Sequence, residues 1–173
     1  SDVVDGGALQ SAFLDWRRAQ ITNLVAAVHQ GVKAIKPQVQ VSAAVFSGYG
    51  YCRDGVGQDW VSWIDQGIVD FLCPMDYTND SERFASLVTE QLAYSAGRVP
   101  IYPGIGASSS SSSFGPDGVI AQIQETRAQG TGGFILFNFD RELATEDLPA
   151  LGLGTTHAVE ADSNAPWRIL LPF

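Results

Sequence analysis

Apolar residues recur along the chain at two periods, and the two periods alternate. Between Leu9 and Lys36 they recur every three or four residues, which is the spacing of an amphipathic helix, and Pro37 ends that helix. The run Val39–Phe46 that follows is short and almost wholly apolar, as is typical of a strand buried on both faces. The pattern therefore predicts a long helix followed by a buried strand.

The same alternation of helix and strand continues to the end of the apolar pattern. Further helices are predicted at Asp59–Gln66, Ser81–Ser95 and Pro116–Gln129, and further strands at Ile68–Met75, Val99–Ile105 and Gly133–Phe139. A short helical turn is expected near Glu142–Leu148, and the serine run 108–113 is expected to be a flexible loop. Strands that follow helices in this rhythm form a parallel sheet with right-handed crossovers.

The predicted fold class is α/β, made of (β/α) units of the TIM-barrel type, with about four parallel strands and their helices. A complete (β/α)₈ barrel typically needs about 250 residues, and this chain has 173, so we expect half of such a barrel. Residues 1–154 are expected to form this (β/α)₄ unit. Residues 155–173 are expected to be a tail or the start of a following segment, because Trp167–Phe173 is apolar and strand-like.

Composition and charge exclude several classes of protein. The formal net charge is −9, and no basic patch is visible, so we expect neither a nucleic-acid partner nor a membrane-surface helix. Two cysteines and two histidines lack the spacing of metal ligands, and we expect no metal or other cofactor. Cys52 and Cys73 are read as free thiols, with a disulfide between them as the alternative. The polar opening without Met leads us to expect an internal piece of a longer protein.

Candidate chemistry is sought where the strands end, because sites of parallel α/β sheets lie at the carboxyl ends of the strands. Asp76 directly follows an apolar strand. Its carboxyl would be partly desolvated there, which raises its pKa and suits a general acid in the hydrolysis of a glycosidic bond. The alternative is a strand-end aspartate that caps the following turn.

Other residues beyond the strand ends have the types that bind sugars: aromatic rings stack on pyranose faces, and amide, carboxylate and guanidinium groups hydrogen-bond hydroxyls. The candidate substrate-binding residues are Tyr77, Arg53, Asn138, Asp140 and Tyr102. Asp140 can equally be a turn residue beside Arg141 and Glu142, and Arg53 can be an ordinary surface arginine.

Several segments together resemble the glycosyl-hydrolase-like family 10 proteins. The segments that carry the resemblance are DWRR (15–18), VKAIKP (32–37), VSAAVF (41–46), DWVSW (59–63), VDFLCPMDY (69–77), PIYPGIG (100–106) and LPALGLG (148–154). Proteins of this family are bacterial, usually exported (β/α)₈ barrels. The resemblance spans about Phe13 to Gly154 and implies strands five to eight of the barrel.

The resemblance also implies a role for Asp76. In the related α-galactosidase-like barrels, the nucleophilic carboxylate follows strand four and the acid/base carboxylate follows strand six. Asp76 follows the strand that corresponds to strand six, so it inherits the acid/base role. The motif that would supply the nucleophile is not present in this chain.

Three functional readings follow from these observations. The first is a glycoside-hydrolase-like domain that acts on polysaccharides or oligosaccharides, with Asp76 as general acid/base and the second carboxylate missing from this chain. The second is a barrel-derived module that binds carbohydrate without cutting it. The third is a structural half-barrel that pairs with the N-terminal half of the same barrel or with a second copy. A secreted, periplasmic or cell-surface location is expected.

Overall fold

The computed structural model describes residues 2–3 and 6–156. Its helices are α1 (Gln10–Ile35), α2 (Trp60–Asp65), α3 (Ser81–Ser95), α4 (Pro116–Ala128) and α5 (Leu148–Gly152), with short π-helical turns η1 (Tyr51–Val56) and η2 (Leu143–Asp147). Its strands are β1 (Ser42–Phe46), β2 (Phe71–Met75), β3 (Gly104–Gly106) and β4 (Ile135–Phe137). Each predicted strand overlaps an observed one. The apolar stretch Trp167–Phe173 lies outside the described residues.

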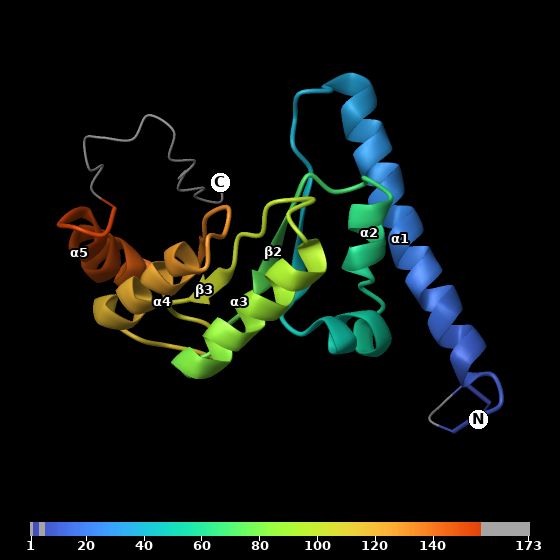
Figure 1. The fold of residues 1–173 in the computed structure, drawn as a ribbon, viewed down its shortest axis with the longest axis horizontal. Helices are drawn as coiled ribbons and strands as arrows, with labels where there is room; N and C mark the ends of the chain where they lie inside the picture. Colours follow the sequence, from blue (N-terminus) through green and yellow to red (C-terminus); the bar gives the residue numbers. More distant parts are fainter. Residues whose placement is uncertain (1, 4–5, 157–173) are drawn as a thin grey trace.

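The four strands form one sheet in the order β1-β2-β3-β4, and every neighbouring pair is parallel. The elements follow one another across the molecule in chain order, from α1 and α2 at one end to α4 and α5 at the other (Figure 1). This arrangement confirms the predicted α/β class with parallel (β/α) units, and it is consistent with half of a TIM-type barrel.

The helices cover one face of the sheet. Leu72 packs with Trp60 and Trp63 of α2, and Ile105 packs with Phe84 of α3. The strand register places Leu72 and Ile105 on the same face, because Met75 pairs with Gly104 and side chains alternate along each strand. The other face, here called the open face, is lined by residues that share the register of Met75. These are Ser42, Ala44, Phe46, Phe71, Cys73, Met75, Gly104, Gly106, Ile135 and Phe137.

The observed strands are shorter than predicted, and proline explains the largest difference. The expected strand Val99–Ile105 contains Pro100 and Pro103, which have no N–H to donate to a neighbouring strand. Pairing near Ile101 is therefore reduced to a single bridge with Leu72, and regular pairing begins only at β3. Pro103 takes part as an acceptor, since its carbonyl receives the Ile135 N–H at 3.0 Å.

Helix ends follow the sequence signals. Asp80 caps α3 by accepting the backbone N–H of Arg83 at 3.0 Å, and Gly97 follows the end of this helix with a positive φ of 72°. Among the described residues, no helix is long and apolar enough to cross a membrane.

Candidate functional site

Two aromatic side chains form a stacked pair at the carboxyl ends of the strands. The rings of Tyr77, just after β2, and Phe137, the last residue of β4, are 5.1 Å apart and inclined by 14°. Phe137 is 43 % exposed although it lies beside a buried strand, and it belongs to the open face. The pair therefore places two aromatic rings on the side of the sheet that the helices leave uncovered.

Two glycines of β3, the strand between them, make room for this pair. A Cβ on Gly104 would lie 3.1 Å from Cε1 of the Tyr77 ring and 2.8 Å from the Pro74 carbonyl oxygen. A Cβ on Gly106 would lie 3.0 Å from Tyr77 Cβ and 2.2 Å from Ser112 Oγ. Because β3 has no side chains at these positions, the Tyr77 ring can lie across it toward Phe137.

Asp76 follows β2 at the predicted end of the sheet, and its side chain lies on the helix-covered face. Alternation along β2 places it with Leu72 and Pro74, toward the helices, and its exposed fraction is 0 %. Gln91 of α3 donates from Nε2 to Asp76 Oδ1 at 2.7 Å. The carboxyl thus lies in the layer between sheet and helices, and it is fully buried where the sequence predicted partial desolvation.

The protonation of Asp76 follows from this position. Burial raises its pKa well above the usual value, and the Gln91 bond and the Arg83 charge only partly oppose the increase. Oδ2 has no hydrogen-bond partner among the described residues. Burial therefore favours the neutral carboxylic acid over the anion. Burial also raises the pKa of the neighbouring Tyr77 hydroxyl, to about 12, with a smaller contribution from the Asp76 charge.

Asn138 and Asp140, which follow β4, both bind Ser108, which follows β3. Asn138 Nδ2 donates to the Ser108 carbonyl at 3.3 Å, and the Ser108 hydroxyl donates to Asp140 Oδ2. Asp140 also accepts the Leu143 N–H at 2.9 Å. The Ser108 hydroxyl is the main reason why the pKa of Asp140 is lowered. Asp140 is thus an ionised residue that joins two strand-end loops and begins the next helical turn.

The serine run, expected to be a flexible loop, forms a turn that is closed by hydrogen bonds. Ser109 Oγ accepts the N–H groups of Ser111 and Ser112, and the Ser112 hydroxyl donates to the Gly106 carbonyl at 2.6 Å. Asn79, beyond β2, accepts the Ser113 N–H at 3.0 Å. Short hydroxyl side chains close such turns by bonding to nearby backbone. The run therefore connects the strand-end loops beyond β2 and β3.

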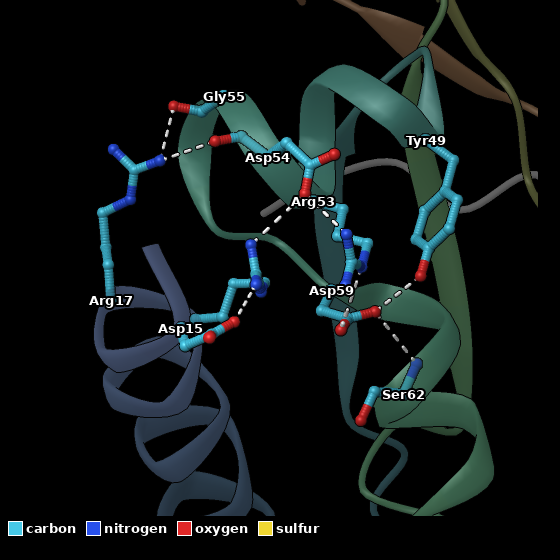
Figure 2. A network of polar contacts seen from close by, with 9 residues as sticks. Asp15, Arg17, Tyr49, Arg53, Asp54, Gly55, Asp59 and Ser62 are labelled. Carbon is cyan, nitrogen blue, oxygen red and sulfur yellow. Dashed lines mark hydrogen bonds and ion pairs between the residues drawn. The ribbon is translucent and has the colours of Figure 1, made fainter. Parts of the chain in front are cut away.

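Arg53 lies in η1 and is held by two carboxylates. Its guanidinium is 2.7 Å from Asp54 Oδ1 and 3.8 Å from Asp59 Oδ2, and 41 % of the side chain is exposed. Figure 2 shows this network between α1, η1 and α2, in which Tyr49 donates to Asp59 and Arg17 donates to the backbone of η1. Arg53 follows β1, so it lies at the predicted end of the sheet, where it contributes to holding η1 against its neighbours.

Tyr102 does not join Tyr77 and Phe137. Its ring makes an edge contact with Phe71, the first residue of β2, at a centroid distance of 5.0 Å. A Cβ on Gly132, which precedes β4, would lie 3.3 Å from the Tyr102 ring. Tyr102 is therefore near the amino ends of the strands, at the opposite end from the stacked pair. Its predicted role in binding has no support from this placement.

The remaining candidate chemistry concerns thiols and metals. Cys52 and Cys73 are both free, and the Cys52 thiol donates to the Phe46 carbonyl at 2.7 Å. Burial raises the pKa of each thiol to about 11, so both are protonated at neutral pH. Within the described part of the chain, no group of three or more His, Cys, Asp or Glu side chains is placed to hold a metal ion.

Two residues of this region were missed from the sequence, and each had a signal. Gln91 lies on the apolar stripe of its helix with Phe84, Val88 and Ser95, so it is a polar residue at a core position. Phe137 ends an apolar strand and directly precedes Asn138, which the sequence analysis names as a candidate substrate-binding residue. A search for polar residues on core stripes and for aromatic residues on the open face would have found both.

The fold and this arrangement define a class: a parallel (β/α) sheet of the TIM-barrel type with polar and aromatic residues gathered at the carboxyl ends of its strands. The sequence model of a family described as glycosyl hydrolase-like 10 matches residues 6–107, more than half of the chain. The chain therefore belongs to the glycosyl hydrolase-like 10 family. The match includes Asp76 and Tyr77 and ends before β4. A search of curated proteins found no match.

Proposed function

We propose that this chain forms the sugar-binding wall of a glycoside-hydrolase-like barrel that acts on polysaccharides or oligosaccharides. The observation that supports it best is the stacked pair of Tyr77 and Phe137 at the carboxyl ends of the strands, on the open face. Aromatic faces carry partial negative charge and pack well against the slightly positive C–H groups of a pyranose ring. Asn138 and Asp140 lie beyond the same strand as Phe137 and can bind hydroxyl groups.

Replacing either ring of the stacked pair is expected to weaken glycan binding. Tyr77→Leu and Phe137→Leu keep apolar bulk but remove the flat face, and an aromatic contact contributes about 0.5–1.5 kcal/mol beyond its buried area. The dissociation constant should therefore rise roughly two- to twelve-fold. The measurement is calorimetric titration of the full chain with a panel of soluble oligosaccharides of glucose, galactose and N-acetylglucosamine.

Tyr102→Leu is the matched control, because Tyr102 is also a half-buried aromatic residue but lies near the amino ends of the strands. Unchanged affinity in this control, together with loss in the other two variants, supports the proposed position. Equal affinities in all variants would place glycan binding elsewhere or show that none occurs.

Catalysis is a second candidate function, with Asp76 as the general acid. One observation favours it: burial raises the pKa of Asp76 well above its usual value, which favours the protonated form that a general acid needs. Hydrolysis also needs a second carboxylate, which this proposal assigns to a part of the barrel outside these 173 residues. Because Asp76 has no exposed surface, delivery of its proton requires movement of the segment that follows β2.

The remaining parts of the proposal concern location and partners. The family resemblance implies export, so we place the protein outside the cytoplasm. Four parallel strands do not close a barrel, and we propose that the sheet is completed by the N-terminal half of the same barrel or by a second copy of this chain.

A further inference from the structure

Gln91 connects three elements at the buried side of the strand ends. Its side chain lies on α3 and is 1 % exposed. The same Nε2 atom lies 2.7 Å from Asp76 Oδ1, beyond β2, and 3.0 Å from the Ser47 carbonyl oxygen, beyond β1. One amide group thus holds the carboxyl of Asp76 and the end of β1 at the same time.

The two contacts determine the orientation of the amide. A glutamine NH₂ group has two hydrogens, and here one points to Asp76 and the other to Ser47. The reversed orientation would turn Oε1 toward the Ser47 carbonyl, and neither oxygen can donate. In the observed orientation, Gln91 Oε1 is buried and has no hydrogen-bond partner among the described residues.

The orientation of the amide also determines where the Asp76 proton lies. Oδ1 accepts the Gln91 N–H, so a proton on Oδ1 would compete with that bond. Oδ2 is buried and has no partner among the described residues. In the neutral acid the proton is therefore held on Oδ2, and ionisation leaves an anion that keeps only the Gln91 bond.

We propose that Gln91 is a positioning residue for Asp76: its amide holds Oδ1 against the end of β1, so that Oδ2 is the atom that carries and releases the proton. This inference rests on the proposed acid role of Asp76. It assigns no contact between Gln91 and a substrate. Gln91 controls the orientation and the ionisation of the Asp76 carboxyl.

The charged groups around Asp76 determine the sign of the expected effect. On α3, the charge of Arg83 lowers the pKa of Asp76 and that of Glu90 raises it, while the Gln91 bond lowers it. Beyond α3, the Asp76 charge contributes to raising the pKa of Cys52 in η1 and of Tyr77. Removing the Gln91 donor takes away a bond that favours the anion. The pKa of Asp76 should then rise further.

The test is a titration of the Asp76 carboxyl in the full chain carrying Gln91→Met, which keeps the length and apolar stem of the side chain. The carboxyl is followed by carbon-13 NMR or by its infrared carbonyl band, and its signal is identified by loss in Asp76→Asn. A hydrogen bond to a charged group is worth enough to move a pKa by about one to two pH units. We expect an upward shift of that size.

Gln122→Met is the matched control. Gln122 is also a buried glutamine with an unpartnered Oε1, but it lies on α4 and donates to the Thr78 carbonyl at 2.8 Å. This variant should leave the Asp76 titration unchanged. A second variant, Gln91→Glu, places another carboxyl beside Asp76, and the two groups should share protons and titrate in two separated steps.

The titration and the activity answer separate questions. An upward shift of the Asp76 pKa in Gln91→Met, or two coupled titration steps in Gln91→Glu, supports the inference. It does so even if neither the wild-type protein nor any variant cleaves a glycan, because absence of cleavage contradicts only the proposed function. If the barrel is active, the alkaline limb of its pH–rate profile should move with the titration. The inference is overturned by an Asp76 titration that both Gln91 variants leave unchanged, or by a wild-type carboxyl that never ionises while the chain is folded.

Discussion

Asp76→Asn is expected to stabilise the folded chain at neutral pH and, in the complete barrel, to slow glycan hydrolysis. Burial raises the pKa of Asp76 in the folded state, whereas an unfolded aspartate ionises near its ordinary value of about 3.9. Above that value the unfolded chain loses a proton that the folded chain keeps, so ionisation favours unfolding. Asparagine does not titrate and removes this penalty, while its amide oxygen can still accept the Gln91 N–H.

The expected difference in the free energy of unfolding between wild type and Asp76→Asn depends on pH. Wild type and variant should differ least below the unfolded pKa. The advantage of the variant should then grow by up to about 1.4 kcal/mol for each pH unit until the folded carboxyl ionises. Urea unfolding of both proteins between pH 3 and pH 8 (roughly the range spanned by ordinary carboxyl and histidine pKa values) measures it. Parallel stability curves would contradict the raised pKa.

The activity arm separates catalysis from structure. Loss of a general acid typically costs about 10²–10⁴ in rate, and substrates with good leaving groups should be affected less because they need less protonation. Asp147→Asn is the control, since Asp147 is another buried carboxyl whose pKa is raised, first by burial and then by nearby acidic residues. It should stabilise the chain without slowing hydrolysis. Near-normal turnover in Asp76→Asn would leave Asp76 as a structural carboxyl.

The order and direction of the strands could be predicted because the apolar pattern alone requires them. Strand boundaries could not, since a run such as Val99–Ile105 looks continuous until the missing N–H groups of its prolines are counted. The hydrogen bonds of the serine run could not be predicted for a related reason. It has no apolar periodicity, and its structure depends on hydroxyl and amide groups, including those of Asn79, that come from another loop.

The end of the sheet at which the candidate residues lie could be predicted from the sequence, whereas the face that each one occupies could not. The carboxyl-end rule places Asp76, Arg53 and Asn138 together, and the parallel sheet confirms that they follow strands that run the same way. Which face Asp76 occupies depends on the alternation that begins at Leu72, the residue that packs on α2. A buried carboxyl with one donor is costly, and such local conflicts tend to occur at functional sites. This is a physical reason to test Asp76 first.

The isolated chain is expected to associate into pairs. Among the described strands, β1 and β4 each have one neighbour, so each leaves a row of backbone N–H and C=O groups without strand partners. A twofold pair would place β4 of each copy beside β1 of the other, in parallel, and would give the eight strands of a closed barrel. If the proposed N-terminal half of the barrel is the partner, it would occupy the same edges.

The helix α1 supplies a second reason for association, because it has an apolar stripe outside the core. Its exposed members are Phe13, Trp16, Leu24, Val28 and Ile35. Leu24 is 65 % exposed and Ile35 is 80 % exposed, which is unusual for large apolar side chains on the same side of one helix. In a closed barrel, this side of α1 would lie beside the last helices of the other half.

Light scattering behind a sizing column tests this assembly directly, and the expected mass is twice that of the 18.5 kDa chain. Leu24→Glu should shift the wild-type pair toward monomer, because association would then bury a charge. Gln30→Glu adds the same charge at an exposed position about 120° around α1 from Leu24, and it should leave the pair intact. A cooperatively folded monomer of wild type, unchanged by either substitution, would mean that the sheet edges and the α1 stripe do not require a partner.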